Sequence, residues 1–372
     1  MIKLAVPREI KDSEKRVSIT PDCVKPLKNM GIDVFIESNA GILSSFSDSD
    51  YKLQGAKIVT NKSELYKNAS LITKINVPIK NVKYDEFKFI KSSSSVLSLV
   101  YPQRSKKELS ILKKSKVSVF ALELMPRISR AQSMDVLSSQ SNLSGYKAVV
   151  DAASLYNKAF PLMMTSAGTV PPAKILIVGA GVAGLQAIAT AKRLGAVVFV
   201  FDVRSATKEQ VESLGGNFIT VENSDSGETA DGYAKEMTKA YKNKQAKLLE
   251  ENIKKMDIVI TTALIPGRDA PKIISKRMVD SMKDGSVIID IASEFGGNCE
   301  LTKHGKYITY KNKLIVGPDN LASSVSQDAS RLFSKNILNF IKNSAPSGKF
   351  VDFNWDDELV KGTCLLKNGK SL

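Results

Sequence analysis

The chain has 372 residues, which is too long for one small core and predicts two domains. Its hydrophobic content of 43% favours a folded globular protein over a disordered one. The net charge of +16 comes from lysines spread over the whole length without an aromatic-interleaved basic motif, so we expect a solvated surface and no nucleic-acid site. A weak attraction to an anionic membrane face or an acidic partner stays open.

The first third predicts a parallel α/β domain. Short apolar strands alternate with helical patterns, notably at 22–30 and 106–114, and such alternation is typical of a parallel sheet with crossover helices. A long helical pattern at 132–158 and a loop at 161–172 follow. The strands are expected at 3–6, 34–36, 71–75, 96–100 and 117–121.

A glycine-rich βαβ motif follows that loop. Residues 175–178 form an apolar strand, and Gly179, Gly181 and Gly184 follow in G-x-G-x-x-G spacing before an apolar helix. The first glycine allows the tight turn, the second lets backbone N–H groups approach a pyrophosphate, and the third lets helix and strand pack closely. The helix N-terminus then faces the phosphates with its partial positive charge. The motif predicts a dinucleotide site; a plain glycine-rich turn is the alternative.

Asp202 ends the second strand of this motif and predicts the choice of nucleotide. A carboxylate at this place accepts hydrogen bonds from the adenosine ribose hydroxyls and repels a 2′-phosphate. We therefore expect NAD(H) to be preferred over NADP(H).

The second domain continues with strands expected at 217–220, 257–261, 286–290 and 314–316. The polar stretch 222–245 between them buries little and predicts a mobile surface loop. A last helix at 324–342, with apolar residues at Leu332, Phe333, Ile337, Phe340 and Ile341, returns the chain to the first domain.

The expected fold class is therefore α/β, with two Rossmann-like parallel-sheet domains separated by a cleft and joined by long helices. The first domain comprises 1–131 and 325–372, and the second, NAD(H)-binding domain comprises 132–324 with the long helix at its start.

No membrane span or export signal is expected. The longest apolar stretch, 175–189, is short and broken by glycines, and residues 1–7 enter a strand at once. Cys23, Cys299 and Cys364 are too few and too scattered for a disulfide framework or a metal site, which fits a reducing cytosol.

Two longer stretches carry a family resemblance. The run from Arg127 to Lys147, RISRAQSMDVLSSQSNLSGYK, and the glycine motif with its continuation DVRSATKEQVESLGG closely resemble the NAD(H)-binding α1 subunit (domain I) of proton-translocating nicotinamide nucleotide transhydrogenases, in the alanine dehydrogenase/transhydrogenase superfamily. TTALIPGR from Thr261, GGN from Gly296 and QDAS from Gln327 extend the match over essentially the whole chain. The segment 317–323 departs from the family pattern, so no nucleotide contact is assigned to it.

The resemblance implies site residues and a reaction. Arg127, Gln132 and Asp135 would be the catalytic positioning residues, and with Ser138 they would hold the nicotinamide end of NAD(H). A hydride would then pass directly to NADP(H) bound on a partner subunit, which requires positioning and exclusion of water but no general base. The remaining nucleotide-binding residues are expected to be Val178, Gly179, Gly181, Val182, Ala183, Gly184, Asp202, Val203, Arg204, Gly232, Tyr233, Thr262, Ala263 and Leu264.

The same resemblance implies the partners. We expect a homodimer that associates with membrane-spanning and NADP(H)-binding transhydrogenase subunits, peripheral to the cytoplasmic side of the inner membrane and without a span of its own. In the family, a mobile loop at about 221–239 closes over the nucleotide with Tyr233; from the residues alone, Tyr233 could be an ordinary loop aromatic.

Purely structural or surface roles also fit some of these residues. Gln132 and Asp135 could be solvated residues of a first helical turn, with Asp135 complementing the helix dipole. His304 is expected to be exposed and uninvolved, and 356–358 is expected to be an acidic surface turn without metal.

Two other functions remain as alternatives. Alanine dehydrogenases resemble this chain through Arg16 and Lys74, which would hold a substrate carboxylate and carbonyl. They also need a catalytic histidine near 99–102, which this chain lacks, so proton transfer at a substrate would have no acid or base. The second alternative is a non-catalytic NAD-binding subunit.

Overall fold

The computed structural model describes residues 2–220, 239–265, 267–344 and 353–372. The contacts divide them into two compact units, one of residues up to 140 together with 323–372 and one of 141–322. Each unit holds one mostly parallel sheet with helices on its faces, which confirms the α/β, Rossmann-like fold class. The predicted domain divisions, at 131/132 and 324/325, and the cleft stay predictions.

The sheet of unit 1 has eight strands in the order β17-β16-β6-β5-β4-β1-β2-β3. Strands β1 to β6 run parallel, and β16 and β17 add an antiparallel edge. All five predicted strands are present, but three were missed: β3, β16 and β17. The strands are β1 Ile2–Val6, β2 Ile32–Glu37, β3 Lys57–Val59, β4 Leu71–Asn76, β5 Ser95–Leu99, β6 Ser118–Ala121, β16 Cys364–Lys367 and β17 Lys370–Ser371.

Helix α11 (Ser326–Ser344) is the main helix of unit 1, and its apolar face lies in the core. Phe333, Ile337, Phe340 and Ile341 are fully buried and belong to one cluster with residues of β1, β2 and α1. Leu332, predicted on the same face, is 37% exposed instead. The other helices are α1 Pro21–Asn29, α2 Asp48–Leu53, α3 Lys62–Tyr66, α4 Lys106–Lys114 and α12 Glu358–Thr363, with 3-10 turns η1 Ile42–Ser44, η2 Glu86–Lys88, η3 Leu122–Leu124 and η4 Ser129–Met134.

The sheet of unit 2 has seven strands in the order β11-β10-β9-β12-β13-β15-β14. All pairs are parallel except the one between β14 and β15. Because the chain passes from β9 to β10 on one side and reaches β12 on the other, the strand order reverses at β9. The strands are β9 Lys174–Val178, β10 Val197–Phe201, β11 Asn217–Ile219, β12 Ile258–Thr261, β13 Val287–Asp290, β14 Lys306–Tyr310 and β15 Lys313–Gly317.

Alternate residues of β9 enter separate cores on the two faces of this sheet. Ile175 and Ile177 pack with α5 and α6, whereas Leu176 and Val178 pack with α8 and α9. The helices are α5 Val136–Leu155, which starts in unit 1, α6 Val182–Arg193, α7 Lys208–Ser213, α8 Lys239–Ile253, α9 Lys276–Ser281 and α10 Leu321–Ser324, with η5 Ser205–Thr207 and η6 Ile291–Phe295. Among the described residues, no helix has both the length and the apolar character that a membrane span needs.

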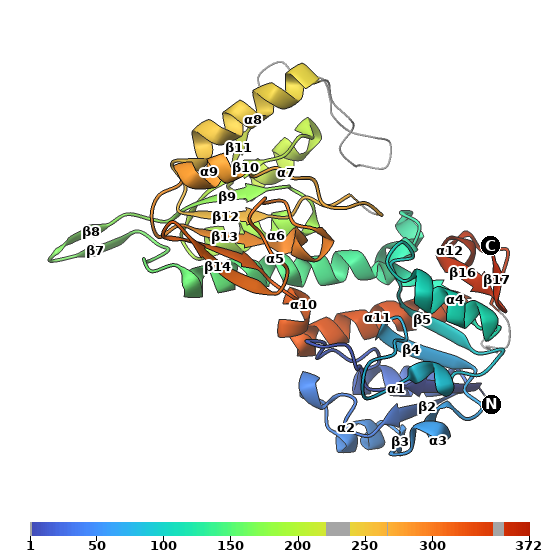
Figure 1. The fold of residues 1–372 in the computed structure, drawn as a ribbon. Coiled ribbons are helices and arrows are strands. Elements are labelled where there is room, and N and C mark those ends of the chain that lie inside the picture. Colours follow the sequence, from blue (N-terminus) through green and yellow to red (C-terminus); the bar gives the residue numbers. More distant parts are fainter. Residues whose placement is uncertain (1, 221–238, 266, 345–352) are drawn as a thin grey trace. The chain divides into compact units, whose positions relative to one another are not determined.

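Three further sequence predictions about local structure were wrong. The expected helix at 132–158 is broken at Asp135, whose backbone is extended and separates η4 from α5. The expected loop at 161–172 contains an exposed hairpin of β7 (Met163–Thr165) and β8 (Gly168–Val170), which projects from the rest of unit 2 (Figure 1). The expected loop at 222–245 ends earlier, because α8 starts at Lys239; residues 221–238 lie outside the described residues.

Candidate functional site

The turn after β9 needs glycine at its first position. Gly179 has φ +103°, and its N–H donates to the Phe201 carbonyl oxygen at the end of β10 over 2.8 Å. A Cβ at Gly179 would lie 2.6 Å from Thr262 Oγ1, which itself donates to the Gly179 carbonyl oxygen. The turn is therefore fixed by both backbone conformation and close packing.

The other two glycines have different roles. A Cβ at Gly184 would lie 1.9 Å from the Gly179 carbonyl oxygen, so helix α6 can approach the turn only without a side chain there. A Cβ at Gly181 would meet nothing within 4 Å. Gly181 is also the N-cap of α6, and no side chain caps the helix. The space beside Gly181 and the first N–H groups of α6 therefore suit a bound anion such as a phosphate.

Asp202 follows β10 and is 8% exposed. Its Oδ2 accepts a hydrogen bond from the Ala180 N–H over 2.6 Å, which ties the carboxylate to the glycine turn. Arg204 donates to the same carboxylate through its backbone N–H (2.8 Å) and its guanidinium (3.0 and 2.8 Å). Arg204 thus lies beside Asp202, an interaction that the sequence alone does not predict.

The segment after β12 forms the second side of the site. Thr262, Ala263 and Leu264 follow the strand that pairs with β9 on the side opposite β10, so they lie where the strand order reverses. In open α/β sheets, ligands bind at the carboxyl ends of strands at such a point. Val178 is buried, whereas Val182 and Leu264 are 40% and 39% exposed.

Asn298 holds this segment in place and was not predicted as a site residue. It is fully buried, its Oδ1 accepts from the Ala263 N–H over 3.0 Å, and its Nδ2 donates to the Ala263 carbonyl oxygen over 2.8 Å. Its only signal in the sequence was its place after two glycines, Gly296 and Gly297. Both glycines have positive φ in the structure.

The predicted nicotinamide-end residues lie in unit 1, around the break between η4 and α5. The Asp135 carboxylate accepts from the Ser138 N–H (2.9 Å) and the Ser138 Oγ (2.5 Å), so the two side chains are in contact and Asp135 caps α5. Gln132 and Arg127 are exposed. Asp135 thus lies at the N-terminus of α5, where its charge complements the helix dipole, and both Asp135 and Ser138 are only partly buried.

The acidic residues 356–358 lie at the turn that leads into α12, and Asp356 and Glu358 are exposed there, as expected. Asp357 differs from its two neighbours: its side chain is 7% exposed, caps α12 and accepts from Nη1 and Nη2 of Arg130 (2.7 and 2.8 Å). The partner lies 227 residues earlier, so no local pattern predicts it. His304 is exposed as expected, and its ring nitrogens contact Ser293 Oγ and Asp319.

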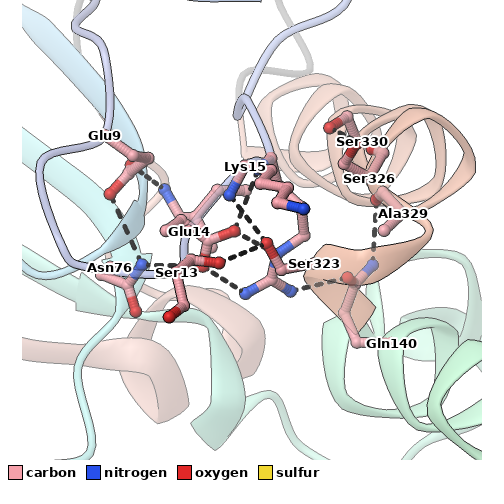
Figure 2. A network of polar contacts seen from close by, with 12 residues as sticks. Glu9, Ser13, Glu14, Lys15, Asn76, Gln140, Ser323, Ser326, Ala329 and Ser330 are labelled. Atoms are coloured by element: carbon pink, nitrogen blue, oxygen red, sulfur yellow. Dashed lines mark hydrogen bonds and ion pairs between the residues drawn. The ribbon is translucent and has the colours of Figure 1, made fainter. Parts of the chain in front are cut away.

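Unit 1 also contains a buried charged network at the carboxyl end of β4. Arg16 donates to both oxygens of Glu14 and, through its other nitrogen, to Gln140 Oε1, each over 2.7 Å; Figure 2 shows Glu14 and Gln140 in this network. Lys74 lies 2.8 Å from Glu86 and 3.3 Å from Glu9.

The pKa values in this network follow from burial and charge. Burial raises the pKa of Glu14, but the charge and hydrogen bonds of Arg16 outweigh this and lower it to about 2. Burial lowers the pKa of Lys74, and Glu86 and Glu9 raise it by more. Burial raises the pKa of Glu9 against the opposing charge of Lys74. The two cations are therefore held charged by carboxylates of the chain itself.

Within the described residues, no group of His, Cys, Asp or Glu side chains is arranged to hold a metal ion. All three cysteines are free and buried, and burial raises their pKa values, for Cys364 to about 11. Gly232 and Tyr233 lie outside the described residues.

Known protein families and relatives match the chain over both units. The family descriptions "Alanine dehydrogenase/PNT, N-terminal domain" and "Alanine dehydrogenase/PNT, C-terminal domain" match residues 5–144 and 148–372. The first part of NAD(P) transhydrogenase subunit alpha from Rhodospirillum rubrum is 48% identical, over 99% of this chain and 97% of the relative, and its counterpart from Rickettsia prowazekii is 44% identical over 99% and 96%.

Solved structures of two enzymes are also similar to this chain. The transhydrogenase from Sinorhizobium meliloti matches with a TM-score of 0.91, 45% identity and full coverage of both chains. An L-alanine dehydrogenase shares the fold, with a TM-score of 0.82, 22% identity, and coverage of 100% of this chain and 97% of its own. The turn geometry, the family matches and the full-length relatives together show that this chain belongs to the alanine dehydrogenase/PNT family.

Proposed function

We propose that this chain is the NAD(H)-binding subunit of a proton-translocating NAD(P) transhydrogenase, in which a hydride passes between NADH on this chain and NADP⁺ on a partner subunit. The observation that carries the proposal is the pairing of an open Gly181, at an uncapped helix N-terminus, with Asp202 hydrogen-bonded to the same turn. The 48% identity with a transhydrogenase alpha subunit over nearly the whole chain supports it.

The residues fit an NAD(H) molecule. Backbone N–H groups at Gly181 and the start of α6 would hold the pyrophosphate, with Val182, Ala183 and the packing of Gly179 and Gly184 shaping that turn. Asp202 would accept from the ribose hydroxyls. Val178, Val203, Arg204, Thr262, Ala263 and Leu264 would line the adenosine end and the second side of the site.

At the nicotinamide end, we assign positioning roles to Arg127, Gln132, Asp135 and Ser138. Exposed amide and guanidinium groups can hydrogen-bond a bound nucleotide and align it, while the Asp135–Ser138 contact fixes the start of α5. Hydride transfer between two nicotinamide rings needs close approach and exclusion of water, and no residue must accept a proton from the reacting carbon. Side chains that hydrogen-bond and position the nucleotide are sufficient for this reaction.

The partners follow from the same proposal. The chain would act as a homodimer bound to membrane-spanning and NADP(H)-binding subunits, peripheral to the cytoplasmic side of the inner membrane. The complex as a whole would couple hydride transfer to proton movement.

Alanine dehydrogenase is the enzyme alternative, and the buried network argues against it. An alanine dehydrogenase from Staphylococcus epidermidis is 31% identical over 84% of this chain. Arg16 and Lys74, however, already face three carboxylates, Glu9, Glu14 and Glu86, so the group carries no surplus positive charge that would attract a substrate carboxylate. A non-catalytic NAD-binding subunit is the other alternative.

One experiment separates the three functions. The chain is mixed with its NADP(H)-binding partner, and hydride transfer from NADH to NADP⁺ is followed together with NADH formation from NAD⁺ and L-alanine. We expect hydride transfer only in the mixture and none with L-alanine. Turnover of L-alanine would support the dehydrogenase, and NADH binding without transfer in the mixture would support a non-catalytic subunit.

A further inference from the structure

The segment that carries Gln132 is held by helix α11 rather than by its own turn. In η4, Ala131 and Met134 are buried in the same cluster as Phe333 and Ile337 of α11, while Gln132 between them is exposed. Apolar packing therefore fixes which side of η4 faces inward. It does not fix the exact position of this short turn, because the hydrogen bonds within a 3-10 turn have poorer geometry than those of an α-helix.

Polar contacts from α11 supply that missing constraint. Asn336 is 8% exposed, and its Nδ2 donates to the Ser133 carbonyl oxygen over 2.9 Å. Its Oδ1 accepts from Ser139 Oγ over 2.8 Å, on the first turns of α5. Asn339, one turn further along α11, donates to the same Ser133 carbonyl oxygen over 3.1 Å. One buried amide thus joins the two sides of the break at Asp135.

A second contact ties α5 to α11 just beyond the break. Gln140 Nε2 donates to the Ala329 carbonyl oxygen over 3.1 Å, as Figure 2 shows. Gln140 fixes α5, and the apolar cluster fixes the inner face of η4. What Asn336 adds, together with Asn339, is a bond to the carbonyl of Ser133, the residue that directly follows Gln132.

We propose that Asn336 is a positioning residue for hydride transfer: its side-chain amide holds the Ser133 carbonyl and Ser139, and thereby sets where the Gln132 side chain stands. This inference rests on the proposed function. Asn336 does not touch the nucleotide in this scheme and acts through the η4 backbone. A buried amide with both its donor and its acceptor used has a defined orientation, so it can transmit position accurately.

The test uses two variants of Asn336 and one control. Asn336→Asp keeps the size and an acceptor for Ser139 but replaces the donor to Ser133 with an oxygen that repels the carbonyl. Asn336→Ala removes the bonds to Ser133 and Ser139 without repulsion and leaves Asn339 as the only one of these two donors to the Ser133 carbonyl. The control is Ser334→Ala, on the same helix: Ser334 is fully buried and accepts from the Thr20 N–H over 3.0 Å, and it does not bond the segment that carries Gln132.

Three quantities are measured: the NADH dissociation constant of the chain alone, the single-turnover hydride-transfer rate in the complex with the NADP(H)-binding partner, and the thermal midpoint of unfolding. A displacement of about 1 Å costs about a hundredfold in rate, so we expect both Asn336 variants to transfer hydride about 10- to 100-fold more slowly. The NADH dissociation constant should change by less than about threefold, because the turn at Gly179 is in the other unit. Ser334→Ala should transfer at the parent rate.

Parent rates in both Asn336 variants would overturn the proposal. So would an equal loss of rate in Ser334→Ala, or unfolding of both Asn336 variants, since either would show that Asn336 serves only the stability of unit 1. A parent complex that binds NADH and transfers no hydride would instead refute the proposed function, and the inference with it.

Discussion

Replacing Asp202 by asparagine should change nucleotide preference in a direction that the structure specifies. The carboxylate accepts from the Ala180 N–H at 2.6 Å and holds Arg204 by two guanidinium contacts. The asparagine side chain would keep one oxygen and lose the charge. Arg204, whose side chain is 18% exposed, would then lack its anion but still reach water, so we expect the variant to fold.

The size of the effect follows from the bonds that are lost. A hydrogen bond to a charged group contributes about 1.5–3 kcal/mol, and about 1.4 kcal/mol corresponds to a tenfold change in affinity. NADH should therefore bind about 10- to 100-fold more weakly to Asp202→Asn. NADPH should bind more tightly than to the parent, because the repulsion of its 2′-phosphate is removed and the freed Arg204 can pair with that phosphate.

A matched variant, Arg204→Gln, should act in the opposite direction. It removes the cation but leaves the Asp202 carboxylate free to accept from ribose hydroxyls and to repel a 2′-phosphate. Titrations of NADH and NADPH against the parent and both variants give the ratio of the two dissociation constants. We expect the preference for NADH to narrow in Asp202→Asn and to widen in Arg204→Gln. An unchanged ratio in Asp202→Asn, or a shift of both variants in the same direction, would refute this account of Asp202.

Three other sets of substitutions test particular contacts. Gly181→Ala should leave the thermal midpoint near that of the parent and weaken NADH binding at least about tenfold, because its Cβ would meet no protein atom but would enter the space for a phosphate. Gly184→Ala should lower the thermal midpoint, because its Cβ would meet the backbone of Gly179. A lower midpoint in Gly181→Ala together with a parent midpoint in Gly184→Ala would contradict these roles. The pKa of Glu14 falls from 4.5 to about 2 on folding, so the stability that this carboxylate contributes is complete above about pH 4.5 and is lost as the pH falls toward 2. Glu14→Gln should therefore lower the free energy of unfolding at pH 7 by on the order of 3 kcal/mol. In the variant this free energy should also decrease less steeply with falling pH, which urea unfolding across this range measures. Gln132→Asn, which shortens the side chain by one methylene, should slow hydride transfer in the complex up to about a hundredfold, while NADH binding to the chain alone changes little. Hydride transfer at the parent rate in this variant would show that Gln132 is not a positioning residue.

The glycine turn and its contact with Asp202 were predictable because their constraints are local. Gly179, Gly184 and Asp202 lie within 24 residues, and each acts on a neighbour inside one βαβ unit, as the contacts of Gly184 with Gly179 and of Asp202 with Ala180 show. Strand and helix periodicity are equally local, so the main strands of both sheets were placed to within a residue or two.

Several features that the sequence did not predict depend on contacts between distant segments. Strand β16 pairs with β6 from the opposite end of the chain, and Asp357 pairs with Arg130 across 227 residues. The hydrogen bonds of Asn298 with Ala263 and of Asn336 with Ser133 also join segments that are far apart in the sequence. An asparagine in a helix or loop has no pattern that names its partner, because the partner is set by the packing of the whole unit.

The most direct test of the proposed function is single-turnover hydride transfer with isotopically labelled NADH. NADH carrying deuterium at the transferable position is bound to this chain, mixed with the partner subunit loaded with NADP⁺, and the NADPH formed is analysed for deuterium. We predict that the label appears in NADPH without exchange with solvent, and that neither protein alone forms NADPH. Loss of the label to water, or no NADPH from a mixture that binds both nucleotides, would contradict direct transfer between two nucleotides held by their proteins.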